Sequence, residues 1–276
     1  MSLSLAAREG IERLAPHLTA LTDGQIESAV DSGRILFDPA FSPENEGDLG
    51  QFYAPFDWIN DKADIVLVGI TPGKHQAGKA LMTLRRALLD GFSAEEAASR
   101  AKQAASFDGD MRQIATKLMD RFRLHTLFGL SSCSDLFGPV AHRVHYTSIL
   151  RRPVLTRKGA AWQNYSGSPA PMRSALLRGS LEKDFAVEAA QLAEAWFVPF
   201  GPVPAETLEE LSRRGILRRD RILTGLNHPS GTQWNRHRCQ LNVGADHSDC
   251  APNVGCAKIR ARSKELDLKV ATLLAA

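Results

Sequence analysis

Residues suited to chemistry occur in two short segments, and each segment directly follows a predicted strand. In the first, His228 stands within Asn227-His-Pro-Ser230, where the proline restricts the histidine to extended backbone and so fixes the direction of its imidazole. An imidazole held in this way can stabilise a developing anion by hydrogen bonding. The competing interpretation is a structural histidine, because a His-Pro-Ser tripeptide alone is a weak motif.

Gly69-Ile-Thr-Pro-Gly73 is the second segment, and Lys74 and His75 follow it. It is not a Walker A loop, since that loop needs four residues between its glycines and Ser or Thr after the lysine. What remains is a tight turn between a strand and a helix, whose backbone N–H groups can face a ligand. An ordinary Pro-Gly turn is the alternative.

Cysteines and histidines gather near the carboxyl end of the chain. Zinc binds thiolate and imidazole groups of this kind, but their spacing matches no zinc finger, and small buried thiols with loop histidines explain them as well. We therefore expect no metal site and no cofactor. The weak candidates for metal ligands are His237, Cys239, His247, Cys250 and Cys256.

The basic residues are unevenly distributed, although the net charge is only +3. No Asp or Glu occurs from Leu136 to Leu181, a stretch that suits an anionic partner such as a phosphate backbone. The alternative is a solvated surface that acidic groups of the N-terminal part balance in three dimensions. The basic residues of the stretch are Arg143, Arg151, Arg152, Arg157, Lys158, Arg173 and Arg178.

Strands and helices alternate along the chain, which predicts a parallel sheet with helices on both faces. Ligands bind outside the carboxyl ends of the strands in such sheets, so we expect Thr71, Ser148 and His228 to line one edge and a common cleft. Residues 38–57 and 157–171 are predicted to be loops. The predicted strands are 63–70, 144–150, 196–201 and 221–226, and the predicted helices are 3–20, 78–89, 93–105, 110–122, 184–195, 204–215 and 257–274.

Length and composition favour one domain over residues 1–276, since 43% of the residues are hydrophobic and can form a sizeable core. We expect a core at about 55–240, an N-terminal helical and loop extension at 1–54, and a C-terminal helix at 257–274. The longest apolar runs are too short to cross a bilayer, and no signal peptide is evident. A cytoplasmic protein without a membrane partner is therefore expected, and its oligomeric state stays open.

Taken in order, these segments resemble the uracil-DNA glycosylase superfamily. Residues 69–73 resemble its first motif in the mismatch-specific branch, 144–153 are similar to a strand of the thermophilic-type branch, and 226–231 look like the second motif. The resemblance implies a three-layer α/β/α sandwich around a central four-stranded parallel sheet. It also implies hydrolysis of the N-glycosidic bond of uracil or another deaminated base in DNA. The DNA partner can be single-stranded or mismatched, because a base rotates out of such DNA at the least free-energy cost.

The resemblance assigns roles to individual residues. His228 donates to the leaving base, Thr71 orients the attacking water, and Ser148 contacts the base edge. Thr71 and Ser148 replace carboxamide or carboxylate groups of the family, so the recognised base stays open. Trp234 is expected to enter the DNA stack, and its alternative is packing against the core. The further substrate-binding positions are Gly69, Pro72, Gly73, Asn227 and Ser230, and the DNA-binding positions are Arg151, Arg152, Trp234 and Arg236.

Two other functions fit the same residues. A non-catalytic module that binds nucleic acid or nucleotides on this fold follows from the two replaced groups, because binding survives when chemistry does not. Hydrolysis of another N-glycoside, such as a free nucleoside, is the third possibility.

Overall fold

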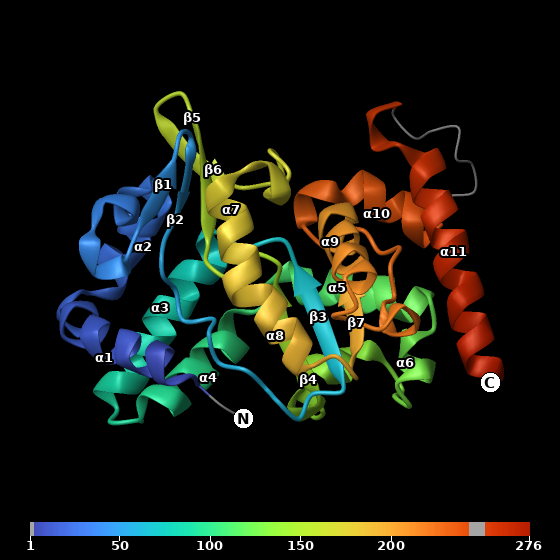
Figure 1. The fold of residues 1–276 in the computed structure, drawn as a ribbon, viewed down its shortest axis with the longest axis horizontal. Coiled ribbons are helices and arrows are strands. Elements are labelled where there is room, and N and C mark those ends of the chain that lie inside the picture. Colours follow the sequence, from blue (N-terminus) through green and yellow to red (C-terminus); the bar gives the residue numbers. More distant parts are fainter. Residues whose placement is uncertain (1–2, 243–251) are drawn as a thin grey trace. The chain divides into compact units, whose positions relative to one another are not determined.

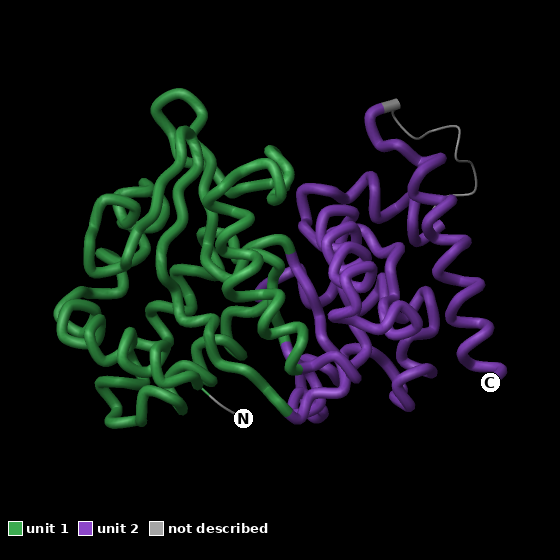
Figure 2. The backbone as a smooth tube through the Cα atoms, in the orientation of Figure 1, with its two compact units in different colours: residues 1–61, 70–106, 146–191 green, residues 62–69, 107–145, 192–276 purple. Residues whose placement is uncertain are grey.

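The structure is a computed structural model, and it describes residues 3–242 and 252–276. Its backbone divides into two compact units, each assembled from segments that are far apart in the sequence (Figure 2). Unit 1 comprises residues 1–61, 70–106 and 146–191, and unit 2 comprises residues 62–69, 107–145 and 192–276.

Unit 1 contains a four-stranded antiparallel sheet in the order β1-β2-β5-β6 (Figure 1). Strands β5 and β6 form a hairpin whose two-residue loop begins at Gly159, which has a φ of +60°. Residues 38–57 and 157–171 were predicted to be loops, and this prediction is wrong where β1, β2, β6 and the end of β5 lie. The strands are short and β1 and β6 are largely exposed, so they lack the apolar alternation that marks a strand. Their bounds are β1 Glu44–Glu46, β2 Leu49–Gln51, β5 Val154–Lys158 and β6 Ala161–Asn164.

The helices of unit 1 carry the capping residues that the sequence suggests. Ser93 forms a capping box with Glu96 at the start of α4, within the helix predicted at 93–105, and Thr22 forms one with Gln25 at the start of α2. Helix α3 begins at Lys74, four residues before its predicted start. A π-helical turn at Leu181–Phe185 joins α7 to α8. The helices are α1 Leu5–Ala20, α2 Asp23–Ser32, α3 Lys74–Leu89, α4 Ala94–Ala105, α7 Ala175–Ser180 and α8 Ala186–Gln191.

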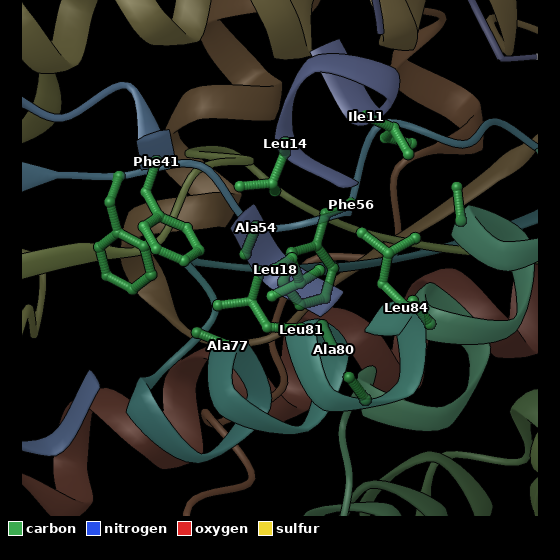
Figure 3. Packing of buried hydrophobic residues seen from close by; sticks show 14 of the residues in the cluster. Ile11, Leu14, Leu18, Phe41, Ala54, Phe56, Ala77, Ala80, Leu81 and Leu84 are labelled. Carbon is green, nitrogen blue, oxygen red and sulfur yellow. The ribbon is translucent and has the colours of Figure 1, made fainter. Parts of the chain in front are cut away.

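The core of unit 1 lies between α1, α3 and the chain that leads into and out of β2 (Figure 3). Ile11, Leu14 and Leu18 recur at helical spacing on α1 and are buried. Leu81 and Leu84 do the same on α3. Burial of these side chains supplies the hydrophobic free energy that holds the two helices together.

Unit 2 is built on a three-stranded parallel sheet in the order β4-β3-β7 (Figure 1). Strand β3, Ile65–Gly69, is buried along its whole length, as a strand covered on both faces must be. It pairs with β7, Trp196–Pro199, from Ile65 opposite Trp196 onward. Strand β4, Val144–Ser148, starts in unit 2, and from Tyr146 on its residues belong to unit 1.

The prediction of a fourth parallel strand at 221–226 is wrong. This segment makes one parallel bridge, between Phe197 and Ile222, and its next backbone bond to the chain of β7 is the one that Leu226 accepts from the N–H of Gly201. Gly225 has a φ of +133°, and a Cβ atom there would lie 2.9 Å from the backbone oxygen of Arg262 and from Cβ of Leu266. The close approach of α11 therefore requires glycine at this position, and its positive φ departs from the extended backbone of a regular strand.

Helices complete unit 2. Pro202 and Pro204 lie in the first turn of α9, and Gly215, with a φ of +76°, follows its end. No helix within residues 3–242 and 252–276 combines the length and the apolar character needed to cross a membrane. The helices of unit 2 are α5 Asp110–Arg121, α6 Leu124–Leu127, α9 Pro202–Arg213, α10 Trp234–Leu241 and α11 Cys256–Ala275.

Short 3-10 helices connect the larger elements in both units. They lie at Arg34–Phe37, Pro39–Phe41, Cys133–Phe137, Ala141–Arg143, Pro171–Arg173, Arg219–Arg221, Gly231–Gln233 and Pro252–Val254. The chain is thus a mixed α/β protein, with one parallel and one antiparallel sheet.

Truncation of Leu81 tests the core of unit 1. Leu81 on α3 is fully buried, and Leu81→Ala should lower the free energy of unfolding by about 2–5 kcal/mol through lost burial and a residual cavity. Leu89→Ala on the same helix is the matched control, because Leu89 is 57% exposed, and its effect should stay within about 0.5 kcal/mol. Urea unfolding measures both, and equal losses would contradict this packing.

Candidate functional site

The carboxyl edge of the parallel sheet positions His228. The N–H of Phe200 donates to the oxygen of Val68 at 2.9 Å, and the N–H of Gly201 donates to the oxygen of Leu226 at 2.9 Å. The segment that carries His228 therefore runs beside the end of β7. A Cβ atom at Gly201, whose φ is +101°, would lie 3.4 Å from Cβ of His228. Glycine thus allows the close approach, and the carboxyl ends of β3 and β7 and His228 share one edge of the sheet.

Burial keeps the His228 imidazole neutral. Burial first, and then the neighbouring His237, lower the pKa of His228 from 6.5 to about 4. At neutral pH the ring therefore carries one N–H donor and one acceptor nitrogen. A neutral imidazole can donate a hydrogen bond to a ligand oxygen on which negative charge develops.

Asn227 anchors the His228 segment to α10 and α11. Its backbone N–H donates to Oε1 of Gln240 at 2.7 Å, and its Nδ2 donates to the oxygen of Arg236 at 2.9 Å. Its Oδ1 accepts from Arg262 at 3.3 Å. Both ends of the Asn227 side chain are thus engaged within the protein, so we assign Asn227 a positioning role in place of substrate contact.

The residues after His228 are held in a similar way. Nε2 of His237, a fully buried residue of α10, donates to the oxygen of Ser230 at 2.8 Å. The Ser230 hydroxyl lies 2.9 Å from the hydroxyl of Thr232. The backbone of the His-Pro-Ser segment is therefore fixed from the side of α10, and the Ser230 hydroxyl lies at its half-buried surface.

Trp234 is exposed at the start of α10. Its side chain is 48% accessible, and its ring meets the His237 ring edge-on with centroids 6.5 Å apart. Trp234 therefore does not pack into the core, and that alternative is wrong. Arg236, two residues further along α10, is also exposed.

Thr71 lies in unit 1, where its hydroxyl bonds to backbone. Its Oγ1 donates to the oxygen of Arg152 at 2.9 Å and accepts from the N–H of Val154 at 3.1 Å. The single hydroxyl proton is thereby used, and one lone pair is left for a further donor such as water. Thr71 therefore ties the turn before α3 to the chain between β4 and β5.

The turn at Pro72 and Gly73 offers few free N–H groups. The N–H of Gly73 donates to Oε1 of Gln76 at 2.8 Å, and the N–H of Lys74 donates to Oδ1 of Asn164 at 2.9 Å. These side chains cap the start of α3. The expectation that these N–H groups face a ligand is not met, because the protein's own side chains satisfy them.

Ser148 ends β4 and is half-buried. Two residues later the N–H of Leu150 donates to the oxygen of Ile70, at 3.0 Å. Since Ile70 directly precedes Thr71, the structure brings the segments of Ser148 and Thr71 side by side within unit 1, as expected for neighbouring strand ends.

Arg151, which was predicted to bind DNA, has its positive charge neutralised by carboxylates of the protein. Its guanidinium is bound by the carboxylates of Asp57 at 3.2 Å, Asp184 at 3.1 Å and Glu188 at 3.1 Å. Burial alone would lower the Arg151 pKa, but these carboxylates raise it above its usual value. Arg152, by contrast, pairs with the more exposed Glu44 at 2.8 Å.

Lys102 lies behind this cluster and was not anticipated from the sequence. It is 1% exposed, and its Nζ donates to the oxygen of Trp58 at 2.7 Å. Burial lowers its pKa to about 8, although Glu188 opposes the shift. A signal was present, because Lys102 falls on the alanine face of α4 together with Ala98, Ala101 and Ala105, all buried.

Acidic partners also bind other members of the basic stretch. Arg143 pairs with Asp64 at 2.6 Å, and Arg157 approaches Asp48 at 4.0 Å. The charge pattern that suggested an anionic partner is therefore partly neutralised by ion pairs with acidic residues from elsewhere in the chain. Lys158, Arg173 and Arg178 are exposed.

The cysteine and histidine candidates do not form a metal centre in the described part of the chain. No group of three or more His, Cys, Asp or Glu side chains suited to a metal ion occurs among residues 3–242 and 252–276. Cys239 is a buried free thiol, and Cys256 is disulfide-bonded. His247 and Cys250 lie outside the described residues.

Comparison with known proteins identifies a relative. No protein-family model matches the chain, and no solved structure matches it. YoxB of Bacillus subtilis (strain 168), which is described as an uncharacterized protein, is 34% identical over 214 residues. The match covers 76% of this chain and 82% of YoxB.

Substitution of Arg151 tests the buried charge cluster. Arg151→Met should lower the free energy of unfolding by about 3–5 kcal/mol, because three carboxylates lose their common partner. The adjacent Arg152→Met is the control and should cost about 0–1 kcal/mol, since its ion pair is more exposed. Chemical denaturation measures both, and a loss at Arg151 no larger than that at Arg152 would refute this assignment.

The lowered pKa of His228 predicts acid sensitivity in a defined window. Between pH 6.5 and about 4 the unfolded chain binds a proton at His228 that the folded chain does not, so stability falls as the pH drops through this window. The slope is at most about 1.4 kcal/mol per pH unit for one proton. The His228→Asn variant should lose this part of the slope. An imidazole NMR titration with a midpoint near 6.5 would contradict the prediction.

Proposed function

The chain belongs to the same protein family as YoxB of Bacillus subtilis, and we propose that it is a DNA glycosylase that hydrolyses the N-glycosidic bond of uracil or another deaminated base. The proposal includes a fold of the uracil-DNA glycosylase type. The order of the resembling segments supports it. The single observation that carries it is the neutral imidazole of His228 at the carboxyl edge of the parallel sheet.

His228 supplies the electrophilic group in this proposal. Cleavage of an N-glycosidic bond leaves positive charge on the sugar and negative charge on the departing base. The neutral imidazole donates a hydrogen bond to the base oxygen, and this bond strengthens as the oxygen gains charge. A pKa of about 4 keeps the donor in one protonation state through the physiological pH range.

DNA is the proposed partner, in single-stranded or mismatched form. A base must leave the helical stack before its glycosidic bond is accessible, and the cost is least where pairing is already lost. Trp234 is exposed at the start of α10 and can fill the vacated stack, while Arg236 on the same helix can contact the backbone.

Thr71 and Ser148 keep the roles that the resemblance assigns, in weaker form. The free lone pair of the Thr71 hydroxyl can accept a hydrogen bond from water but cannot remove its proton as a carboxylate would. The Ser148 hydroxyl makes one contact where a carboxamide makes two. We therefore propose slow catalysis with a relaxed choice of base.

A non-catalytic module that binds nucleic acid is the second candidate. The observation in its favour is the Thr71 hydroxyl, whose proton is donated to backbone within unit 1. In this case Trp234 and Arg236 still bind DNA, but no base is released.

A strand-cleavage assay tests the proposal. Oligonucleotides that contain uracil, hypoxanthine or xanthine, single-stranded or mismatched, are incubated with the protein and then treated with alkali, which breaks the chain at abasic sites. We expect base release from at least one substrate. His228→Ala should reduce the rate about 100- to 1,000-fold, the usual loss when one donor to a developing anion is removed.

The control variant is His142→Ala, which removes a histidine that is exposed ahead of β4. It should release the base at the wild-type rate. Undiminished release by His228→Ala would remove the proposed role of that residue. No release from any substrate, together with salt-sensitive DNA binding, would instead support the binding module. Release from free nucleosides alone would point to another N-glycoside as substrate.

A further inference from the structure

Helices α10 and α11 pack against each other in unit 2 and carry an excess of positive charge (Figure 1). No Asp or Glu occurs in residues 231–242 or 252–264, and Asp246 and Asp249 of the intervening segment lie outside the described residues. Within the described part of the chain, no cation of these two stretches forms an ion pair. The cations are Arg236, Arg238, Lys258, Arg260, Arg262 and Lys264.

Two of these arginines meet at Asn227, the residue directly before His228. Nδ2 of Asn227 donates to the backbone oxygen of Arg236 at 2.9 Å, and Nη2 of Arg262 donates to Oδ1 of Asn227 at 3.3 Å. One amide group therefore holds the backbone of Arg236 and the guanidinium of Arg262 beside the His228 segment. Arg236 is exposed and Arg262 is half-buried, so both side chains reach the surface of unit 2.

The charges of Arg236 and Arg262 lack a carboxylate partner. Burial first, and then the charge of Arg236, lower the pKa of Arg262, whereas the charge of Glu206 on α9 raises it. Glu206 forms no ion pair with Arg262 in the described part of the chain, and Glu265, the first acidic residue of α11, is exposed. A partly desolvated cation without an anionic partner costs free energy, so a bound anion stabilises this pair of arginines.

A phosphate group is the anion that the two arginines favour. The planar guanidinium of arginine donates in parallel to two phosphate oxygens, and a second guanidinium can bind the remaining oxygens. A carboxylate offers only two oxygens and uses fewer of these donors. Lys258 lies one turn before Arg262 on the same side of α11, where it adds positive charge for a chain of phosphates.

We propose that Arg236 and Arg262 together bind a phosphate group of the DNA backbone next to the base that His228 contacts. This contact rests on the proposed function, in which DNA is the ligand and His228 meets the base. It extends the phosphate contacts beyond α10, where the resemblance places Arg236, to α11, for which the sequence predicts a helix and no role. Phosphate contacts fix the position of the DNA and carry no base preference, so the choice of base depends on other residues.

Binding of a labelled single-stranded oligonucleotide without uracil tests the inference, because this measurement involves no catalysis. Fluorescence anisotropy gives the affinity of the whole chain over a series of salt concentrations. Each phosphate contact on single-stranded DNA contributes about 0.7 to the slope of log K against log salt concentration. The combined variant Arg236→Gln with Arg262→Gln should therefore reduce the slope by about 0.7 and weaken binding about fivefold at about 0.1 M salt.

Arg260→Gln is the matched control, because it removes the same charge from α11. Arg260 is exposed and lies two residues before Arg262, which places it on the opposite side of the helix, so affinity and slope should stay unchanged. Arg262→Lys keeps the positive charge and should keep the slope near the wild-type value. Thermal unfolding shows whether each variant is folded. Arg236→Gln alone, at an exposed position, should also weaken binding and serves if Arg262→Gln fails to fold.

Three outcomes would overturn the inference. They are unchanged affinity and slope in the combined variant, an equal loss in Arg260→Gln, and no binding of the oligonucleotide by the wild-type chain. Vesicles that contain phosphatidylglycerol are the second probe. If they bind the wild-type chain but not the combined variant, while DNA does not bind, the surface belongs to an anionic lipid and the DNA contact is wrong.

The phosphate contact and the glycosylase activity can fail separately. Base release together with unchanged DNA binding by the combined variant would leave the glycosylase and remove this contact. Weakened binding by the combined variant, with no base release from any substrate by the wild-type chain, would leave the contact and remove the glycosylase.

Discussion

The buried guanidinium of Arg151 is the interaction on which the arrangement of unit 1 depends, because it joins segments that are distant in the sequence. Asp57 reaches it from the chain after β2, and Asp184 and Glu188 reach it from one helical face. Each buried charge is tolerated only while its partners remain, so the segments are held as a set. The chain after β4 is thereby fixed, and Thr71 bonds to the backbone of this same chain.

Polar motif residues in both units stabilise the backbone around the positions where chemistry is proposed. Asn227 uses its whole amide group to hold the His228 segment against α10 and α11. Thr71 uses its hydroxyl to join the turn before α3 to the chain before β5. A hydroxyl or amide that bonds to backbone uses the same atoms that a ligand would need, so a resemblance between motifs does not by itself assign the role of each side chain.

The sequence predicts local features well and long-range ones poorly. The helix that starts after Ser93 and the strand β3 are encoded within a few residues each, and both elements were predicted correctly. The hairpin of β5 and β6 was missed, because exposed strands carry no apolar alternation. The strand expected at 221–226 is reduced to one bridge at Ile222, and Gly225 within it meets α11, a contact that no local pattern reveals. For Lys102, the buried alanine face of α4 was a local signal of burial, but its partner, the backbone oxygen of Trp58, is distant in the sequence.

The chemistry proposed for His228 tolerates a weak water-binding group better than other hydrolyses do. In N-glycoside cleavage the bond to the base can be largely broken before water attacks, and the sugar then carries oxocarbenium-like charge. The barrier in such a reaction depends more on stabilising the departing base than on activating the nucleophile. In the proposed reaction, a fixed, neutral donor at His228 would act on the departing base, whereas Thr71 would act only on the later step. Under this proposal, Thr71 at the position of the carboxamide or carboxylate that the resemblance implies argues for slow turnover more strongly than for the absence of catalysis.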